Sequence, residues 1–572
     1  MTARPSLVAF FAFAAILIGI VPSGGTSAAT PNDHFRYFSG AATLTVTKTA
    51  DTNDGVCDAD CSLREAIAAA NAGDTIAFSP LFSASQTITL ALGEFTLTKN
   101  VTITGPGAGL LTVSGNGNSR VFSINSGLTV ALSGMTITGG NAVGAQMSGL
   151  GGGVLNLGST VGLTNTTISG NLITGSGGGI FNNAGTLTIT NSTLSGNTTN
   201  GGSGGGAVFN QTGATVNIIT STVSGNNTSG NGAGVYNNAG TVSVTGSAIA
   251  NNTTGNLGGG LFNNGAGLIT VTNSTISGNG AGNGGGINNS GGTVNVTGST
   301  FSANSATNNN VGGGIFNSGT LTVINSTFSG NSATQGGGIY NNSSVNVTNS
   351  TFSNNSATGG GGIFNVGGGV TLRNTIIANS PAGGDCSTVF GTFTAGVGNM
   401  ADDATCGSAT QATSAQINLQ ALANNGGPTQ TMALGAGSAA IDAGDDCVVA
   451  AGGCLATPLT TDQRGAGFPR KVGTHVDVGS FEAAAPTAAE VSISGRVLAP
   501  GGGGLRNASV VLTDTHGVTR RVMTSSFGYY IFNNVQSGGS YIMGVESRRF
   551  RYATRVVAVT DSLAAVNFTP LE

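Results

Sequence analysis

The sequence of 572 residues predicts an all-β chain whose body is a right-handed parallel β-helix, a solenoid with a short helical cap at its N-terminal end. Three observations support this fold class: a repeat of 24 to 28 residues, an alternation of apolar and polar residues within each repeat, and a charged-residue content of only 7%. Glycine makes up 99 residues without the three-residue period of collagen. Because the chain is 38% hydrophobic and its net charge is only -4, we expect it to fold rather than to stay disordered.

The N-terminus predicts export. Arg4 precedes an apolar run at residues 7–21, and small residues follow it at 27–29. This pattern is typical of a secretory signal peptide over residues 1–29, and the run is too short for a membrane-spanning helix, which needs about 20 apolar residues. No second apolar stretch of spanning length occurs, so we expect a secreted or cell-surface chain without a transmembrane segment after cleavage.

Residues 30–100 are expected to form the N-terminal cap and the first rungs. Ser62 followed by Glu65 is a capping box, and Gly73 supplies a C-terminal stop, so a short helix is predicted over about residues 63–70. Leu63 and Ile67 share one face of this helix. That face can cover the strand edges and core that a solenoid exposes at its end.

The loop before this helix offers a calcium site as an alternative to a plain acidic loop. Its candidate ligands are Asp51, Asp54, Asp58 and Asp60. The EF-hand pattern requires Gly at its sixth position, which counted from Asp51 is Val56. A solvated acidic loop explains the same residues, and apart from calcium the sequence suggests no cofactor.

Residues 101–380 carry the repeats. One unit, G-G-G-I-F-N-N-A-G-T-L-T-I-T-N-S-T-L-S-G-N, runs from Gly177 to Asn197, and nine copies are visible. The alternation at residues 186–190 predicts a strand with one buried face, and inward pairs such as Leu187 and Ile189 would stack from rung to rung. Nine rungs at a spacing of about 4.8 Å give a section about 40 Å long.

Asparagine recurs at two turn positions of each repeat. Asn tolerates left-handed backbone, and stacked Asn side chains form ladders, so these residues are interpreted as structural. The first series is Asn156, Asn182, Asn210, Asn237, Asn263, Asn289, Asn317, Asn341 and Asn365. The second is Asn171, Asn197, Asn226, Asn252, Asn279, Asn304, Asn331 and Asn355.

Six cysteines lie outside the repeats, an even number in a chain predicted to be exported. Fifteen pairings are possible, and proximity in sequence favours three short disulfides. These would join Cys57 to Cys61, Cys386 to Cys406 and Cys447 to Cys454.

Catalysis by the repeats is excluded by their composition. Hydrolysis and lyase chemistry need proton-transfer groups, yet residues 121–372 contain no Asp, Glu, Lys, Arg or His. Such groups crowd at the ends of the β-helix, and in residues 381–482 the candidate catalytic acids are Asp442, Asp462 and Asp477. The same acids can instead close the solenoid as ion pairs with nearby arginines, since structural networks also perturb carboxylates.

Several segments resemble known families of exported β-helix proteins. The pairing of G-G-G-[IVL] with [FILV]-x-x-N, as in residues 328–339, resembles the repeats of polymorphic outer-membrane proteins. The segment from Cys61 to Ala66 matches the CSLREA motif. Residues 440–444, 461–465 and 476–482 resemble the closing segment of choice-of-anchor β-helix proteins. These resemblances cover residues 42–482 and imply a bacterial envelope or secreted location, with no general reaction.

A separate module is expected over residues 491–572, after a small-residue linker at 483–490. Ser494-Gly-Arg-Val and Phe527-Gly-Tyr-Tyr resemble the carboxypeptidase regulatory-like domain. The resemblance implies a small β-sandwich that serves exported proteins as a folding, spacer or binding module. It implies no peptidase, and His516 alone supplies no zinc ligand set.

The charge of this module differs from that of the rest of the chain. It holds eight arginines against four acids, about +4, whereas residues 30–490 hold nine basic residues against eighteen acids, about -9. Arg548, Arg549, Arg551 and Arg555 lie close in sequence, and on one surface they would attract an acidic polymer. A solvated basic face is the alternative interpretation.

The sequence thus favours a non-enzymatic surface protein that binds envelope or extracellular polysaccharide or a surface protein, and no nucleic acid. The alternative is a polysaccharide lyase or glycoside hydrolase with its site in the charged segment at 381–482. A third hypothesis is binding to a lattice such as ice through outward threonines, including Thr186, Thr188 and Thr190. Ser243 and Asn295 interrupt that face, and the sequence does not set an oligomeric state.

Overall fold

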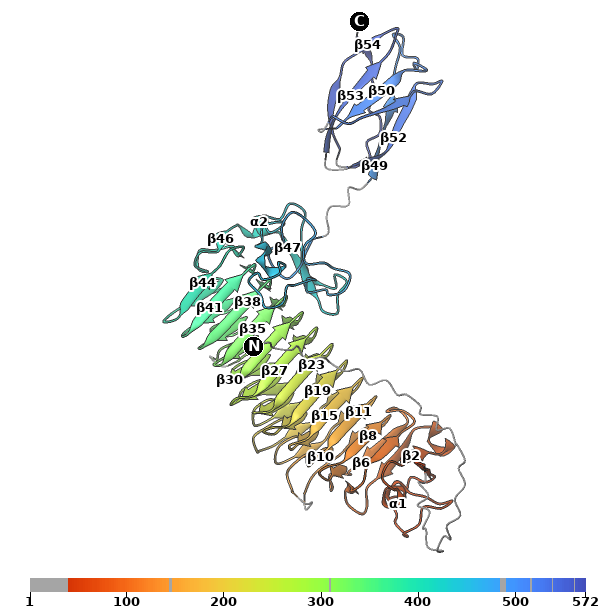
Figure 1. The fold of residues 1–572 in the computed structure, drawn as a ribbon, viewed down its shortest axis with the longest axis vertical. Coiled ribbons are helices and arrows are strands. Elements are labelled where there is room, and N and C mark those ends of the chain that lie inside the picture. The colour runs from red at the N-terminus through yellow and green to blue at the C-terminus, as the bar shows by residue number, and fades with distance from the viewer. Residues whose placement is uncertain are drawn as a thin grey trace, which may run out of the picture.

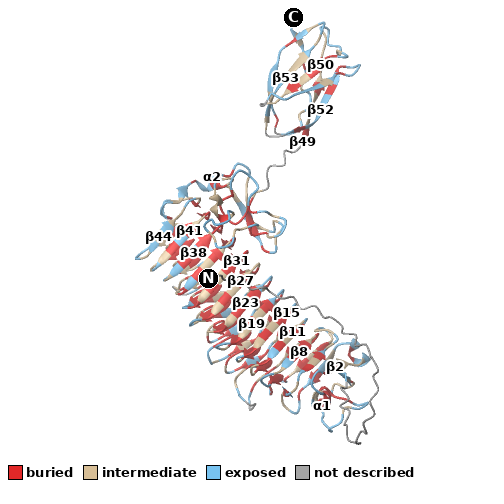
Figure 2. Ribbon diagram, viewed as in Figure 1, coloured by how far each residue is buried: buried red, intermediate tan, exposed pale blue. Residues whose placement is uncertain are grey.

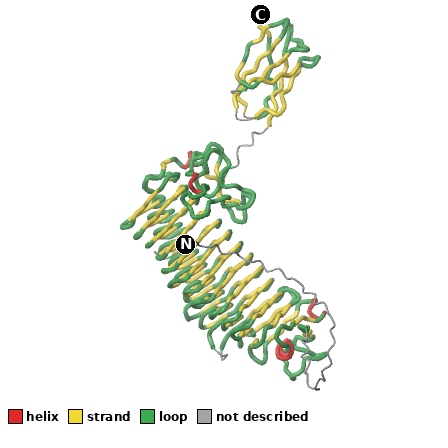
Figure 3. Tube along the Cα trace, in the orientation of Figure 1, coloured by secondary structure: helices red, strands yellow, loops and turns green. Residues whose placement is uncertain are grey.

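The computed structural model describes residues 40–143, 147–307, 310–483, 490–514, 517–536, 539–559 and 561–571. The predicted signal peptide at 1–29 and most of the linker at 483–490 lie outside these ranges. The described chain is an all-β parallel β-helix followed by a second module of antiparallel strands, which confirms the predicted fold class (Figures 1 and 3). No helix among the described residues has the length and apolar character needed to cross a membrane.

Three long parallel sheets form the walls of the β-helix. Sheet A has 14 strands, from β1 (Thr43–Val46) to β44 (Thr392–Ala395). Sheet B also has 14, from β3 (Gln86–Thr89) to β46 (Thr410–Gln411), and sheet C has 12, from β4 (Phe95–Leu97) to β43 (Cys386–Thr388). A short fourth sheet of six two-residue strands runs from β13 (Leu172–Ile173) to β33 (Ser305–Ala306).

One rung illustrates how the repeat folds. It passes through β14 (Ile180–Asn182) in sheet C, β15 (Thr186–Thr190) in sheet A, β16 (Thr193–Ser195) in sheet B and β17 (Thr198–Thr199). Leu187 and Ile189 of β15 are fully buried, while the threonines that alternate with them are only partly buried and face outward. Leu187 pairs with Val216 of the next rung, so like residues stack in register and the core is continuous (Figure 2).

Both asparagine series form hydrogen-bonded ladders in the turns. From Asn156 to Asn365, each side-chain Nδ2 donates to Oδ1 of the next ladder residue at 2.8 or 2.9 Å, and all nine side chains are fully buried. From Asn171 to Asn355 the same bond recurs at 2.8–3.0 Å. Each ladder therefore joins every rung to its neighbours by neutral polar bonds.

A third ladder, of serines, was not predicted. Between sheets A and B, Oγ of Ser221 accepts from the backbone N–H of Ser192, and its own backbone N–H donates to Oγ of Ser247. The same bond continues rung by rung to Ser350. The serine hydroxyls donate to nearby backbone carbonyls, so this turn is also satisfied without charge.

A single short helix caps the N-terminal end. α1 (Leu63–Ala69) begins with the expected capping box, in which Ser62 Oγ accepts from the N–H of Glu65 and the Glu65 carboxylate accepts from the N–H of Ser62. Leu63 and Ala66 are buried against the first rungs. The helix therefore covers the open end of the core.

The closing segment at residues 381–482 folds back over the outer face of sheet B. It contains α2 (Ser414–Ile417), the antiparallel pair β47 (Leu419–Ala423) and β48 (Thr431–Leu434), and the 3₁₀ turn η2 (Asp446–Val448). The hydroxyl of Thr327, on β36 (Thr327–Ser329), donates to Gln463 Oε1 at 2.6 Å, and Asn325 Nδ2 donates to the carbonyl of Thr461 at 2.9 Å. The segment thus lies along rungs that precede it by about 130 residues or more.

The C-terminal module has its own core, made of residues such as Ile493, Val510 and Phe532. Strand β49 (Glu490–Arg496) pairs antiparallel with β52 (Tyr529–Gln536). A four-stranded sheet has the order β51 (Thr519–Met523), β50 (Ser509–Thr513), β53 (Gly539–Glu546) and β55 (Arg555–Val559). A short pair joins β54 (Arg551–Tyr552) to β56 (Pro570–Leu571).

Candidate functional site

An open cleft of about 880 Å³ lies in the C-terminal module. It is bounded by the segment before β50 and by the turn between β53 and β54. Four arginines line it: Arg506, Arg548, Arg549 and Arg551. All four side chains are exposed. Within the described residues none of them takes part in an ion pair, and the acid in the cleft wall, Glu546, is held by Arg521 at 3.1 Å. Among the described residues the cleft therefore carries more positive than negative charge.

Three of the four arginines named from the sequence line this cleft, and the fourth does not. Arg548, Arg549 and Arg551 share the cleft, but Arg555 on β55 does not line it. The Arg555 guanidinium donates to the carbonyl of Asn567 at 3.0 Å and lies 5.7 Å from the Phe568 ring centroid. Closeness in sequence is a poor guide here because Arg551 lies on β54, which pairs with β56, whereas Arg555 lies on β55 of the four-stranded sheet.

Arg506 joins the cleft from a distant part of the sequence and was not predicted. Antiparallel pairing of β50 with β53 places Ser509 opposite Glu546, so the residues just before β50 lie beside those just after β53. Only the strand order could have revealed this neighbour.

Apolar side chains share the cleft wall with the arginines. They are Leu505, Met523, Phe550 and Leu571. Polar groups at Asn507, Ser509 and Ser547 lie between them. Arginines beside apolar surface suit a ligand that has anionic groups on a partly apolar ring or chain.

Two of the candidate catalytic acids, Asp462 and Asp477, belong to a buried network in the closing segment, whereas Asp442 is half-buried and its carboxylate accepts from the N–H of His475. Asp462 forms an ion pair with Arg464, with Nη2 and Oδ2 2.6 Å apart, and it also accepts from the N–H of Glu482. Asp477 accepts from the N–H groups of Asp442 and Ala483. Asp462 and Asp477 are each only 2% exposed, so a polymer reaches neither carboxylate unless the segment rearranges.

A fully buried arginine, Arg470, lies at the centre of this network. It bonds to the Glu482 carboxylate at 2.9 Å and donates to the carbonyls of Asp477 and Gly479. Burial raises the pKa of Glu482 to about 7, while the Arg470 charge acts in the opposite direction. Burial also raises the pKa of Asp477. The bonds to backbone groups give these acids a structural role in holding the loops of residues 460–482 together.

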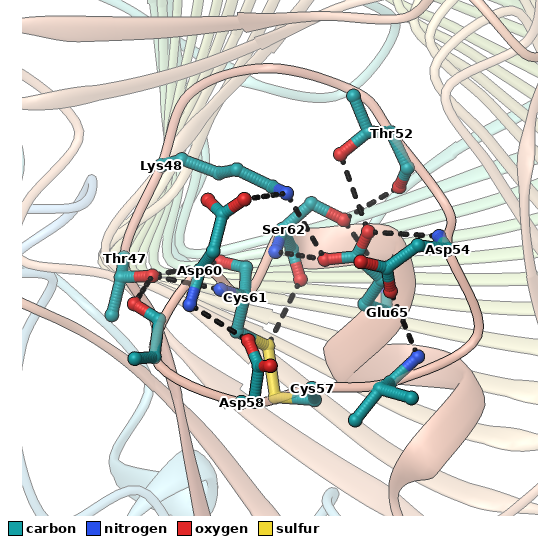
Figure 4. The surroundings of a disulfide bond; sticks show 12 residues. Thr47, Lys48, Thr52, Asp54, Cys57, Asp58, Asp60, Cys61, Ser62 and Glu65 are labelled. Carbon is teal, nitrogen blue, oxygen red and sulfur yellow. Dashed lines mark hydrogen bonds and ion pairs between the residues drawn. A yellow bond between two sulfur atoms is a disulfide. The ribbon is translucent and has the colours of Figure 1, made fainter.

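The acidic loop near the N-terminus does not assemble the predicted calcium ligands. Asp51 bonds to Arg64 at 2.7 Å and accepts from the N–H groups of Ala91 and Leu92. Asp54 and Asp58 each accept from a backbone N–H two residues later, and Asp60 pairs with Lys48 at 3.1 Å (Figure 4). The four carboxylates therefore have separate partners and do not converge.

Glu65 ties this loop to the helical cap. Its carboxylate accepts from the N–H groups of Ser62 and Asp54 and lies 3.5 Å from Lys48 Nζ (Figure 4). Burial alone would raise the pKa of Glu65, but these hydrogen bonds outweigh it and lower the pKa to about 2. Glu65 is thus an ionised anchor of the cap.

The disulfides pair as proximity in sequence predicts. Cys57 bonds to Cys61, Cys386 to Cys406 and Cys447 to Cys454. Each closes a short loop at one end of the β-helix, where the ladders no longer hold the chain.

Comparison with known proteins concerns the fold. No protein-family model matches the chain, and no curated protein matches it. Among solved structures it is similar to pectate lyase Pel9A, with 16% identity and a TM-score of 0.36 over 78% of this chain and 97% of the lyase. It is also similar to the PL6 family alginate lyase AlyGC, with 12% identity and a TM-score of 0.40 over 80% of this chain and 61% of the lyase. A third similar structure is PfbA, a surface adhesin of Streptococcus pneumoniae, with 10% identity and a TM-score of 0.29 over 63% of this chain and 91% of the adhesin. At these identities the likeness is one of β-helical architecture alone.

Proposed function

We propose that this chain is an exported, non-enzymatic binding protein of the bacterial surface, and that its C-terminal module binds acidic polysaccharide in the arginine cleft. The observation that carries the proposal is the set of four exposed arginines, Arg506, Arg548, Arg549 and Arg551, around one cleft without an ion pair in the described chain. The β-helix serves as a rigid spacer for this module.

The chemistry of the cleft fits sugar carboxylates or sulfates. A guanidinium group donates two parallel hydrogen bonds to a carboxylate, and several of them engage successive anionic groups of a polymer. Apolar atoms of Leu505, Met523 and Phe550 can contact the ring faces between those groups. Because the arginines are exposed, the attraction is screened by salt and weakens as ionic strength rises.

The repeat body supports a binding role over catalysis. Residues 121–372 offer no Asp, Glu, Lys, Arg or His, and therefore no side chain suited to proton transfer at neutral pH. The acids that the chain does possess near its C-terminal closure are engaged by backbone N–H groups and arginines. A body without charge also repels neither sign of polymer.

The test is binding of the full mature chain to immobilised polygalacturonate, with neutral dextran as the control ligand, at low and high salt. Wild-type protein is expected to be retained on polygalacturonate at low salt and released at high salt. Replacing Arg548, Arg549 and Arg551 by Gln should abolish retention. A charge-matched control replaces Arg496, Arg520 and Arg555, which lie outside the cleft, by Gln and should keep most of it. Equal loss in both triple variants would reduce the effect to net charge and overturn the proposal.

The same samples test the enzyme alternative. Appearance of reducing ends or unsaturated sugars would favour a lyase or hydrolase with its site in the closing segment. In that case Asp442→Asn, Asp462→Asn and Asp477→Asn would identify the acid involved. Unchanged polymer in the presence of bound protein supports a binding function.

A further inference from the structure

Three aspartates meet at the last rungs of the β-helix, apart from the sites described above. Asp385 immediately precedes β43, and Asp402 and Asp403 immediately follow β45 (Met400–Ala401). The disulfide between Cys386 and Cys406 joins the same two segments, with their Cα atoms 5.0 Å apart. The chain thus holds two acidic segments together covalently.

The carboxylates of Asp385 and Asp403 lie close together, and Asp402 approaches Asp385 through its backbone N–H. A carboxylate oxygen of Asp385 lies within 4.8 Å of one of Asp403. The N–H of Asp385 donates to Asp403 Oδ2 at 2.9 Å, and the N–H of Asp402 donates to Asp385 Oδ2 at 3.2 Å. Hydroxyl groups lie at the edge of the cluster, since Ser414 Oγ donates to Asp402 and Thr405 Oγ1 donates to Asp403. All of these groups are oxygen ligands.

This cluster lacks the arginine partner that several other buried acids of the chain possess. Asp51, Asp462 and Glu482 each contact an arginine, whereas in the described part of the chain no Lys, Arg or His forms an ion pair with any of the three aspartates. Such a concentration of negative charge is unfavourable unless a cation or a proton occupies it.

Asp385 supplies an independent sign of a missing ligand. Its side chain is fully buried, and its Oδ1 atom has no hydrogen-bond partner. A buried carboxylate oxygen without a partner is costly, and in folded proteins such atoms are normally satisfied by a donor, an ion or water.

We propose that Asp385 and Asp403, beside Asp402, bind a calcium ion at the C-terminal end of the β-helix. Calcium takes six to eight oxygen ligands in flexible geometry, and carboxylates with adjacent hydroxyls supply this type of donor. Structural zinc sites are built mainly from thiolate and imidazole ligands, but Cys406 is committed to a disulfide. The bound ion would join the start of β43 to the segment after β45 and so stabilise the last rungs.

The experiment uses the full mature chain treated with EDTA, and titrates CaCl2 by calorimetry, with MgCl2 in parallel. We expect one calcium ion to bind per chain with a Kd of about 10⁻⁴ to 10⁻³ M, typical of extracellular calcium modules, and to raise the Tm. Asp385→Asn and Asp403→Asn should each weaken binding about tenfold or more. The matched control, Asp54→Asn with Asp58→Asn and Asp60→Asn, removes three acids of the other loop and should bind calcium like wild type.

Thermal stability distinguishes calcium binding by the aspartates from a purely structural role of these residues. Without calcium, Asp385→Asn should unfold at a higher temperature than wild type, because it removes a buried acid that lies beside two other carboxylates. With calcium the order should reverse. Absence of calcium binding to wild type at about 10 mM, or wild-type binding in both the Asp385 and the Asp403 variants, would overturn the proposal. Glycan retention by the arginine cleft is measured separately, so either proposal can fail while the other stands.

Discussion

The repeat body and the two ends of the β-helix bury polar groups in opposite ways. In the body, Asn263 accepts from Asn237 and donates to Asn289, all three side chains fully buried and neutral. At the ends, buried polar groups are charged: Arg470 pairs with Glu482 in the closing segment, and Arg64 pairs with Asp51 at the cap. The two regions therefore differ in electrostatics although they share one continuous solenoid.

Repetition explains the difference. An amide side chain is both donor and acceptor, so the same residue can be stacked at every rung, about 4.8 Å apart, with every bond satisfied. Like charges stacked at that spacing would repel one another at every step. An ion pair is consequently suited to a position that occurs once, and the ends of a solenoid are such positions. The charged closures also present a surface onto which no further rung can stack.

The largest effect should come from breaking the register of the body. Deleting residues 232–257 removes one rung of 26 residues and leaves the neighbouring strands in phase, since Val235 pairs with Leu261. Deleting only residues 242–246 shifts the following residues by an odd number and turns buried side chains outward. We expect soluble, cooperatively unfolding protein from the first deletion and aggregated or unfolded protein from the second, measured by circular dichroism and thermal melting.

Residues 232–257 are chosen for the deletion because, within the described chain, this rung makes no such contacts as residues 312–334 do. In that later rung, Asn325 and Thr327 bond to the closing segment. A partial deletion that melts like wild type, beside a whole-rung deletion that does not fold, would contradict the rung assignment.

A smaller but still large effect is expected at the closure. Arg470→Met removes the ion-pair partner of the buried Glu482 carboxylate and should lower the free energy of unfolding by about 3–5 kcal/mol. The double variant Arg470→Met with Glu482→Leu removes both charges and should recover much of that loss. Urea unfolding of the full chain measures both. Equal stability of the single and double variants would show that the ion pair does not account for the effect.

Removing one ladder residue should lower the free energy of unfolding by a smaller amount. Asn263→Ala leaves one N–H of Asn237 and one oxygen of Asn289 without their partners and should destabilise by about 1–3 kcal/mol. Asn227 is exposed, and Asn227→Ala should change the stability by no more than about 0.5 kcal/mol. The comparison is made by chemical denaturation, and similar losses at the two sites would remove the ladder as a source of stability.

The smallest effect should be pH-dependent and confined to the cap. Because the pKa of Glu65 is lowered from its ordinary 4.5 to about 2, the stability it contributes is fully present above pH 4.5 and is lost as the pH falls through about 2. Glu65→Gln keeps the shape of the capping box and should cost on the order of 1 kcal/mol at pH 7. The difference from wild type should shrink between pH 4.5 and 2 in thermal melts. A difference that is constant over this range would exclude the charge as its cause.

Periodic features could be predicted from the sequence, and features that depend on contact between distant segments could not. The spacing of Asn182 and Asn210 and the alternation at residues 186–190 recur often enough to fix the strands, the turns and the buried face. The capping box at Ser62 is local and was equally accessible. The serine ladder also repeats, but Ser192 and Ser221 lie in the polar part of the repeat, where serine gives no signal of burial.

The candidate sites were predicted only in part for the same reason. Arg506 joins the cleft through strand pairing, and Asp385 meets Asp402 across a turn of the solenoid. The acids at 51, 54, 58 and 60 are close in sequence, but the structure gives each its own partner. A high density of charged residues in the sequence thus indicated which segments could carry a site. It did not show which of their side chains lie together in the structure.

The fold-back of the closing segment sets an order of assembly. Rungs contact their immediate neighbours, so the solenoid can grow by local steps from any point at which it nucleates. Gln463, however, bonds to Thr300 and Thr327, which lie on two successive rungs. It can therefore dock only after those rungs have been built and stacked. The closure is expected to be the late, slow event of folding, because its contacts span more than 130 residues of chain. The closing segment would then dock only on a β-helix whose preceding rungs are already formed.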